Sequence, residues 1–469
     1  MIPAVLPAAL SRRKFMGGVT AIAGAGMLAA CATQQRAATP TEQRPAGQAT
    51  VTDKLTVLQV DDFHPDHNAF LKEEITRFAQ EKNWHLELAN VAGFLAGMDI
   101  YQKLLAQKQA DQPPDFLFHG LSTRQMVFLK LLREQTSFVE DLQKRYGRAY
   151  STARATQVID GKWWSVPFYD RTGGYWVRED KFKALGVDID KDLDTWEKVR
   201  ESCLKVSDPA GNFYGWGMSV NRSGDGESLV WNIIWSWGGA LADKSGQTVT
   251  LNSKETIDGL TWLKEVYTDP KWARMVPPGV NSWTDPDNNQ AYLAGTLAFT
   301  SNAGTLYAKA VLDKNPIAPT IKVLPQPLGP AKQRLQSSGG HYFYFFDGSK
   351  NYDAARQLAE HLLSVDVQRQ LWKISTGYVV PAYEKWWDDP LIEGDENSRR
   401  FKPVSFADTS FQGIAWRGPL SEAADAVSAQ NVATDMMGEI LAGKPVEQAV
   451  KDAHNRCVGI FKEFGFKGA

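Results

Sequence analysis

The alternation of hydrophobic and polar residues predicts strands and helices that follow one another along the chain. Residues 54–60 (KLTVLQV) alternate as a half-buried strand does, and Leu71, Ile75, Phe78 and Ala79 then recur at helical spacing. Further along, the pattern predicts a strand at 85–88, a helix at 98–109 and a short buried strand at 115–118. This order predicts an α/β lobe with a largely parallel sheet.

The middle of the chain repeats the same theme. Asn252 with Glu255 three residues later predicts the capped start of a helix that turns Ile257, Leu260 and Val266 inward. The other predicted elements are helices at 195–206 and 351–364 and strands at 296–300, 320–324 and 342–346. Residues 383–410, rich in Trp, Asp and Pro, are predicted to be irregular. The chain then ends in helices, one with Pro445 in its first turn.

Length and composition narrow the class of protein. A chain of 469 residues is longer than one core usually serves, so two lobes are expected. The formal net charge of −2 argues against a nucleic-acid binder, which would carry a basic patch. The 16 tryptophans exceed ordinary usage, and their flat amphipathic rings suit a cleft for ring-shaped polar ligands.

The first residues resemble an export leader. Ser11-Arg12-Arg13-Lys14-Phe15-Met16 resembles a twin-arginine signal, and Leu28-Ala29-Ala30-Cys31 resembles a lipobox. We therefore expect a signal peptide at 1–30, a lipidated Cys31 and a flexible tether to residue 50. The intervening apolar run is shorter than the ~20 residues that a spanning helix needs. The expected product is exported and lipid-anchored, in the periplasm or at the cell surface.

The two remaining cysteines, Cys203 and Cys457, each lie on the apolar stripe of a predicted helix. Buried free thiols are the favoured interpretation. A disulfide between the two stays open, because an exported protein meets oxidising conditions.

The sequence lacks the usual enzyme motifs. It contains no phosphate-binding glycine loop with its lysine, no Gly-x-Ser-x-Gly elbow and no His-Glu-x-x-His pair. His64 and His67 are possible metal ligands, although capping of the following helix is the favoured role. The carboxylate pairs Asp61-Asp62 and Asp388-Asp389 keep a glycosidase open as a distant alternative, with turn and cap positions as the simpler explanation.

The most informative loop is residues 160–175 (DGKWWSVPFYDRTGGY). Tyr169, Asp170 and Arg171 place an aromatic ring beside opposite charges ahead of a Gly-Gly break. Charged groups bind hydroxyls and rings stack on sugar faces, so the loop suits a polyol site; a salt-linked hinge is the alternative. Trp231, Trp235 and Trp237 lie near helical spacing, which usually means core, and Trp237 before Gly238-Gly239 is the best candidate to face a cleft.

The chain resembles family 1 extracytoplasmic solute-binding proteins of ABC importers, whose best-known members bind maltose and other sugars. The matching motifs run in family order over nearly the whole chain: Leu55 to Phe78, Pro114 to Phe118, Asp160-Gly161-Lys162 with Val166-Pro167, Thr195-Trp196-Glu197, Tyr214-Gly215, Trp237-Gly238-Gly239, Tyr292 to Phe299, Leu324-Pro325, Gly339-Gly340, Thr376-Gly377-Tyr378 and Gly443 to Ala449.

The resemblance implies a two-lobed periplasmic-binding-protein fold of the maltose-binding type, with hinge crossovers and discontinuous lobes. The expected first lobe comprises 51–171 and 340–385, and the second comprises 172–339 and 386–469. It implies a monomeric, non-enzymatic receptor without cofactor or metal, which closes around a carbohydrate and delivers it to the permease subunits. The positions that match ligand-contacting segments are Asp62, His64, His119, Ser122, Tyr169, Asp170, Arg171, Asn221, Arg222, Trp237, Ser301, Asn302, His341, Trp416 and Arg417.

Two alternatives remain beside this expectation and the distant glycosidase. Arg171, Arg222 and Arg417 would also suit an anionic solute such as a glycerol phosphate derivative or an organic anion. A receptor that presents its ligand to a chemoreceptor would use the same cleft and a different outer surface.

Overall fold

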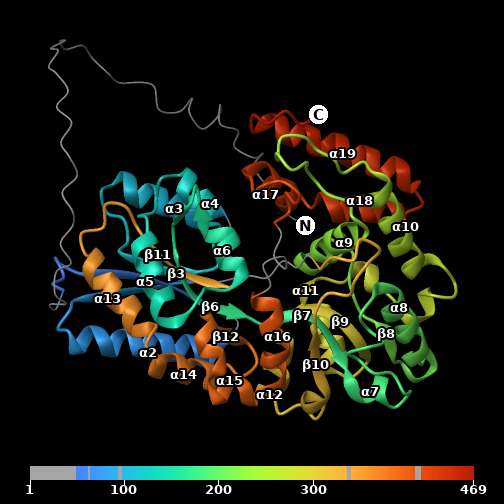
Figure 1. Cartoon of the computed structure of the whole chain (residues 1–469), viewed down its shortest axis with the longest axis horizontal. Helices are drawn as coiled ribbons and strands as arrows, with labels where there is room; N and C mark the ends of the chain where they lie inside the picture. Colours follow the sequence, from blue (N-terminus) through green and yellow to red (C-terminus); the bar gives the residue numbers. More distant parts are fainter. Residues whose placement is uncertain (1–48, 62–63, 93–97, 335–339, 407–412) are drawn as a thin grey trace, which may run out of the picture.

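Two lobes, each a sheet covered by helices, make up the computed structural model, with the first lobe on the left of Figure 1 and the second on the right. The structure describes residues 49–61, 64–92, 98–334, 340–406 and 413–469. The leader, Cys31 and most of the tether therefore lie outside the described residues. No helix in these ranges is long and apolar enough to cross a membrane.

The first lobe is built on a six-stranded sheet in the order β12-β6-β11-β3-β1-β2. Its strands are β1 (Leu55–Asp61), β2 (Leu86–Ala92), β3 (Phe116–His119), β6 (Val166–Arg171), β11 (His341–Phe345) and β12 (Val379–Pro381). β1 pairs in parallel with β2 and β3, while β11 runs antiparallel to β3 and β6. The first three predicted strands are thus present, and the sheet is parallel except for β11 and β12.

Helices cover this sheet and bury their apolar faces against it. They are α2 (Pro65–Glu81), α3 (Met98–Gln109), α4 (Thr123–Phe128), α5 (Thr136–Tyr146), α6 (Ser151–Gln157), α13 (Tyr352–Leu362) and α14 (Val365–Ile374). A short hairpin, β4 (Val158–Ile159) and β5 (Lys162–Trp163), precedes β6. In α2 the buried residues include the predicted face of Leu71, Ile75, Phe78 and Ala79.

The second lobe has a four-stranded sheet in the order β10-β7-β9-β8. Its strands are β7 (Gly173–Arg178), β8 (Tyr214–Trp216), β9 (Leu297–Ala303) and β10 (Ile321–Leu324). Its helices are α7 (Glu179–Lys183), α8 (Trp196–Val206), α9 (Gly224–Trp237), α10 (Lys254–Thr268), α11 (Asp285–Leu293), α12 (Thr305–Leu312), α17 (Glu422–Ala429), α18 (Val432–Leu441) and α19 (Val446–Glu463). Short 3-10 turns at Pro209–Gly211, Ala273–Met275, Val280–Ser282 and Ala318–Thr320 join them.

Two details of this lobe bear on the sequence predictions. Ser253, not Asn252, caps α10, because its hydroxyl accepts a hydrogen bond from Thr256 N at 3.2 Å. Cys203 and Cys457 are buried in the core of the second lobe as free thiols, as favoured.

The segment that was predicted to be irregular is largely helical and lies between the lobes. It holds a 3-10 turn at Glu384–Asp388, α15 (Pro390–Gly394) and α16 (Glu396–Phe406). Trp386, Trp387 and Phe401 belong to the first core, while Asn397 Oδ1 accepts a hydrogen bond from Val323 N of β10 at 2.9 Å. The apolar residues of 386–406 therefore pack in the first core, while α16 also bonds to the second lobe, so this segment bridges the two lobes.

The hinge is a direct passage from β6 into β7 through a single residue. Thr172 N donates to Tyr378 O of the first lobe at 3.0 Å, and Thr172 O accepts from Gly304 N of the second lobe at 2.7 Å. The described residues before 335 and after 339 belong to different lobes, as do those before 407 and after 412, so the chain passes between the lobes three times in all. Three crossings permit bending of one lobe against the other while they limit other motions.

Candidate functional site

One edge of the first sheet gathers several of the predicted residues. β1, β3 and β6 end at this edge and the antiparallel β11 begins there, so residues distant in sequence become neighbours. Tyr169 Oη and His341 Nδ1 are 2.5 Å apart, and the rings of His119 and His341 stack at 5.3 Å with an interplanar angle of 14°. Tyr169 and His341 are buried, while His119 is partly exposed, so the His119 ring is the part of this group that solvent reaches.

The adjoining loops use their polar side chains to begin helices. His64 Nδ1 accepts from His67 N at 3.3 Å as the cap of α2, and Ser122 Oγ accepts from Gln125 N at 3.3 Å as the cap of α4. The capping role favoured for His64 is therefore confirmed. Among the described residues no group of three His, Cys, Asp or Glu is placed to hold a metal ion. Asp62 lies outside the described residues.

Asp170 links the hinge strand to α16. Its Oδ2 accepts from Ser405 Oγ at 2.7 Å and its Oδ1 from Arg171 N at 2.9 Å. Burial raises the pKa of Asp170 to about 7, against the opposing effects of these hydrogen bonds and of the Arg171 charge. Through these hydrogen bonds Asp170 connects the hinge strand β6 to α16.

The second lobe presents a carboxylate beside the hinge, at the start of α9. Asp225 Oδ2 accepts from Asn288 Nδ2 at 2.8 Å and from Asn302 Nδ2 at 3.1 Å. Burial, followed by the charge of Asp285, raises the pKa of this half-buried group to about 7. The predicted residues Ser301 and Asn302 of β9 lie here, since Ser301 O accepts from Asn288 Nδ2 at 3.0 Å.

Sequence reasoning missed Asp225. The available signal was Ser223-Gly224-Asp225-Gly226, a cap and two glycines at the start of a tryptophan-rich helix. The predicted residue Asn221 lies on the loop that leads into α9. Its backbone N–H donates to Ser219 Oγ at 3.0 Å.

The remaining predicted residues are not brought to the hinge. Arg222 pairs with Asp435 of α18, with 2.8 Å between Nη2 and Oδ2. Trp237 lies at the opposite end of α9, roughly 20 Å along the helix from Asp225, and packs on Trp262 at 5.0 Å. Trp416 and Arg417 also lie at that end, where Arg417 Nη2 donates to Gly238 O at 2.8 Å. Arg171, Arg222 and Arg417 therefore do not converge.

Trp231 and Trp235 are core residues, as their spacing suggested. The second carboxylate pair also has structural contacts: Asp388 pairs with Lys402 at 3.0 Å, and Asp389 pairs with Arg369 at 2.7 Å and caps α15. Asp61 accepts from Asn90 Nδ2 at 3.0 Å. The cap position expected for the second pair is confirmed at Asp389, while the first pair is described only at Asp61, whose contact joins β1 to β2.

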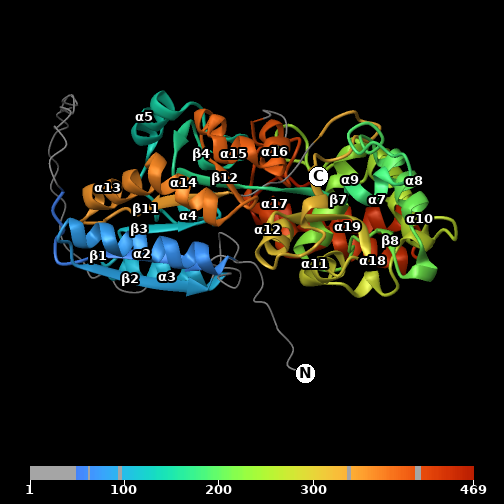
Figure 2. The ribbon, with the colours of Figure 1, turned by 90° about the horizontal axis from the view of Figure 1, so that it is seen from below.

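The lobes also face each other away from the hinge, where α17 lies on the side of the second lobe toward α4 (Figures 1 and 2). Asp425 of α17 interacts electrostatically with Arg124 of α4 and with Tyr101 of α3. Although the Asp425 side chain is exposed, the surrounding protein reduces its hydration and raises its pKa to about 6, against the charge of Arg124.

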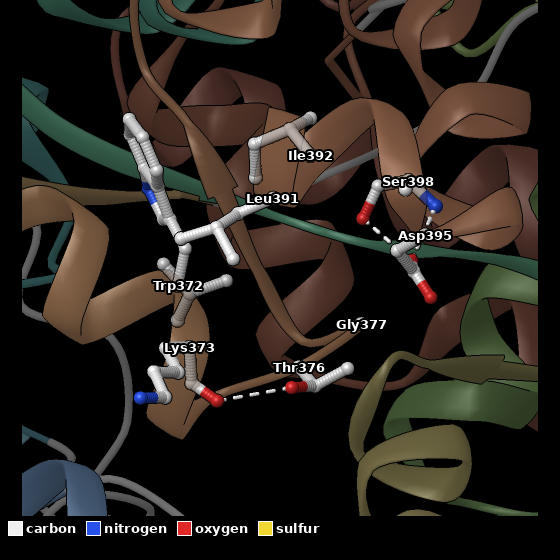
Figure 3. A pocket seen from close by; sticks show the side chains of 10 residues that line it. Trp372, Lys373, Thr376, Gly377, Leu391, Ile392, Asp395 and Ser398 are labelled. Atoms are coloured by element: carbon white, nitrogen blue, oxygen red, sulfur yellow. Dashed lines mark hydrogen bonds between the residues drawn. The ribbon is translucent and has the colours of Figure 1, made fainter. Parts of the chain in front are cut away.

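A cavity of about 270 Å³ lies between α14, α15 and the start of α16 (Figure 3). Trp372, Leu391 and Ile392 form its apolar part, while Thr376 and Asp395 line its polar part. Asp395 Oδ1 accepts from Tyr307 Oη of the second lobe at 3.3 Å, so the cavity adjoins the junction of the lobes.

Comparison with known proteins places this geometry in context. The family model described as "Bacterial extracellular solute-binding protein" matches residues 75–397. A "Probable ABC transporter-binding protein" of Deinococcus radiodurans is 24% identical over 292 residues, which cover 59% of this chain and 64% of that relative. The match thus spans less than two thirds of the curated relative.

Solved structures share the fold at low sequence identity. A maltose-bound MalE3 of T. maritima has a TM-score of 0.69 at 19% identity and covers 86% of this chain and 98% of its own. The sugar-binding protein MalE of Xanthomonas citri has a TM-score of 0.69 at 16% identity, with 87% and 97% covered. The GacH receptor of Streptomyces glaucescens, solved without ligand and with acarbose, reaches 0.66 at 17% identity, with 87% and 99% covered. The two-lobed fold expected for this chain is therefore confirmed.

Proposed function

The chain belongs to the bacterial extracellular solute-binding proteins, and from this premise we propose that it captures a carbohydrate between its lobes and delivers it to an ABC permease. The observation that carries the proposal is the pair of polar edges on either side of the hinge. Tyr169, His119 and His341 lie on one edge, and Asp225 with Asn302 lies on the other.

The two edges have complementary chemistry for a polyol. A sugar offers hydroxyl donors and acceptors around a ring with apolar faces. The Asp225 carboxylate accepts hydrogen bonds from hydroxyl groups, and the amides of Asn288 and Asn302 hold it in place. On the first lobe, the partly exposed His119 ring, stacked on the buried His341, offers a flat surface. A ligand that contacts both edges stabilises the closed arrangement of the lobes.

Several solved relatives carry such ligands, which supports this class of solute. Three of them were solved with maltose, maltotetraose or α-D-tagatose bound, and another with the polyol ribitol. In the proposed arrangement the protein is a lipid-anchored monomer, held outside the cytoplasm through Cys31, and it leaves its solute chemically unchanged.

A thermal-shift screen with these four compounds, followed by calorimetric titration of each hit, tests the proposal. At 100 times Kd a bound solute adds about 2.7 kcal/mol to the free energy of unfolding, which raises Tm by a few degrees. Conversion of the solute to a product, or an unchanged Tm with every carbohydrate of a broader panel, would contradict the proposal.

Asp225→Asn tests the site itself. We expect Kd for a screened sugar to rise about tenfold, because a charged acceptor is replaced by a neutral amide. In the unmodified protein, affinity should fall as pH drops through about 7, where Asp225 takes up a proton, and the variant should lose this dependence. Asp258→Asn, on the exposed surface of α10, is the matched control. Equal affinity of the Asp225 variant and the control would remove Asp225 from the site.

A further inference from the structure

A second polar cavity lies in the second lobe, at the C-terminal end of α9. Its volume is about 540 Å³, and it is lined by Lys244, Gln333, Trp416 and Arg417. These residues come from three separate segments: the loop after α9, the loop after β10 and the segment before α17. The last two segments are continuous with the second and third crossings between the lobes.

Two of the lining residues are held in place by the end of α9. Arg417 Nη2 donates to Gly238 O at 2.8 Å, and Gln333 Nε2 donates to Trp235 O at 3.2 Å. The Arg417 guanidinium also lies 5.3 Å from the centroid of the Trp416 ring. The cavity therefore combines an oriented cation, an amide and an aromatic surface.

The two cations that line this cavity are exposed to solvent and form no ion pair within the described part of the chain. None of the four lining residues is acidic, and neither Lys244 nor Arg417 forms an ion pair with a described carboxylate. Asp243 precedes Lys244, but its carboxylate accepts from Ser245 Oγ at 2.8 Å and from Gln247 N at 3.0 Å. Glu255 of α10 lies beside Gly238 without an ion pair to Arg417.

Lys244 and Arg417 contribute two positive charges to the same cavity, and an anion bound between them would be attracted by both. Guanidinium binds carboxylate or phosphate through two parallel hydrogen bonds, and ammonium adds a point charge. The half-buried Trp416 ring beside them offers a stacking surface for a sugar. A neutral solute would use the ring and the amide and leave both charges uncompensated.

Resting on the carbohydrate-binding function proposed above, we propose that this cavity binds the anionic group of an acidic carbohydrate. That group is either the carboxylate of a uronic acid or a phosphate monoester. Lys244 and Arg417 bind the charge and Trp416 contacts the sugar ring to which it is attached.

Calorimetric titration of the full chain with matched sugars tests this inference. The probes are glucose, galactose and mannose, each as the neutral sugar, the uronic acid and the 6-phosphate. We expect an acidic form to bind at least tenfold more tightly than its neutral form, with this advantage reduced at 0.5 M salt. Comparison of the uronic acid with the 6-phosphate distinguishes the two sources of charge.

Lys244→Gln locates the effect in the cavity. It should raise Kd for the acidic sugar about tenfold and change Kd for the neutral sugar by less than twofold. Arg417→Gln should act in the same direction. Lys350→Gln, an exposed lysine on the first lobe, is the matched control and should change neither value. Unchanged Tm for all three variants shows that the fold is retained.

The outcomes separate the two proposals. A neutral sugar that binds as tightly as its acidic forms overturns the acidic-carbohydrate inference and leaves the carbohydrate receptor standing. An acidic preference that survives both Lys244→Gln and Arg417→Gln also overturns the assignment to this cavity. If no carbohydrate in this or the broader panel binds, both proposals fail.

Discussion

At the scale of single residues, burial clearly destabilises the ionised form of the Asp170 carboxyl group. It is fully buried in the hinge strand and hydrogen-bonded to Ser405 and to the N–H of Arg171. Its pKa of about 7 in the folded protein exceeds its ordinary value of 3.8. The folded state therefore favours the protonated acid, and this stabilisation is lost as pH rises from about 4 through 7.

Asp170→Asn should remove this dependence. The amide keeps an acceptor for Arg171 N and can donate to Ser405 Oγ, so we expect the variant to be more stable than the original protein at pH 8 by on the order of 1–3 kcal/mol. At pH 4 the two proteins should be nearly equal. Urea unfolding at both pH values measures the difference. A variant that is less stable at pH 8 would show that ionised Asp170 stabilises the hinge.

One side of the candidate site was better predicted than the other. Tyr169 was a candidate from its own loop, and His119 and His341 from the family resemblance; the structure brings the three together because strand ends of an α/β sheet meet at one edge. Asp225 was missed because its position depends on Asn288 and Asn302, which lie far along the chain. The sequence likewise gave no sign that Arg222 turns to Asp435.

At the scale of elements, the junction of α14 and β12 depends on a glycine. Gly377 has φ of +71°, and a Cβ atom there would lie 2.2 Å from Tyr307 Cε1 of α12. Its carbonyl also accepts from the Thr172 hydroxyl at the hinge. Small size and positive φ are both required at this position.

Gly377→Ala should destabilise the protein by more than Gly279→Ala. Gly279 has a similar φ of +79°, but a Cβ there meets nothing within 4 Å, so it serves as the control for backbone strain alone. We expect a cost of about 1 kcal/mol for Gly279→Ala and a further 1–3 kcal/mol for Gly377→Ala, because Tyr307 must move. Urea unfolding measures both values. If both variants lose the same free energy of unfolding, the Tyr307 side chain moves aside without an energetic cost.

The hydrophobic periodicity correctly predicted the elements that bury a single face. It did not predict an element that is buried on several faces. The helices α2 and α8 and the strands β1 and β3 follow simple patterns, and the structure contains them. Residues 383–410 were predicted to be irregular because they are rich in Trp, Asp and Pro. The helix α16 within them contacts both lobes and includes Pro403, so it shows no single apolar stripe.

At the scale of the whole molecule, Asp425 and Arg124 lie on opposing lobes and attract each other electrostatically beyond the hinge. When the lobes separate, Asp425 regains water and its pKa should return from about 6 toward 3.8. Closure therefore takes up a proton between these values, and the closed state is favoured as pH falls through about 6.

Asp425→Asn should favour the closed state at pH 7.5, because it removes the cost of partly dehydrating a charge. We expect a smaller radius of gyration in small-angle X-ray scattering without solute, and a Kd for a screened sugar reduced about threefold. Glu463→Gln, near the end of α19, is a surface control that should change neither quantity. A larger radius of gyration would show that the attraction to Arg124 outweighs the loss of hydration.

The position of β11 determines the order in which the lobes can be completed during synthesis. This strand lies between β6 and β3, and Tyr344 within it bonds to Leu121 across a separation of 223 residues. The ribosome must therefore deliver all four strands of the second sheet before the first sheet can receive its central strand. A nascent chain that ends before β11 leaves the inner edges of β3 and β6 open to unintended pairing, so the second lobe's sheet has the opportunity to form first.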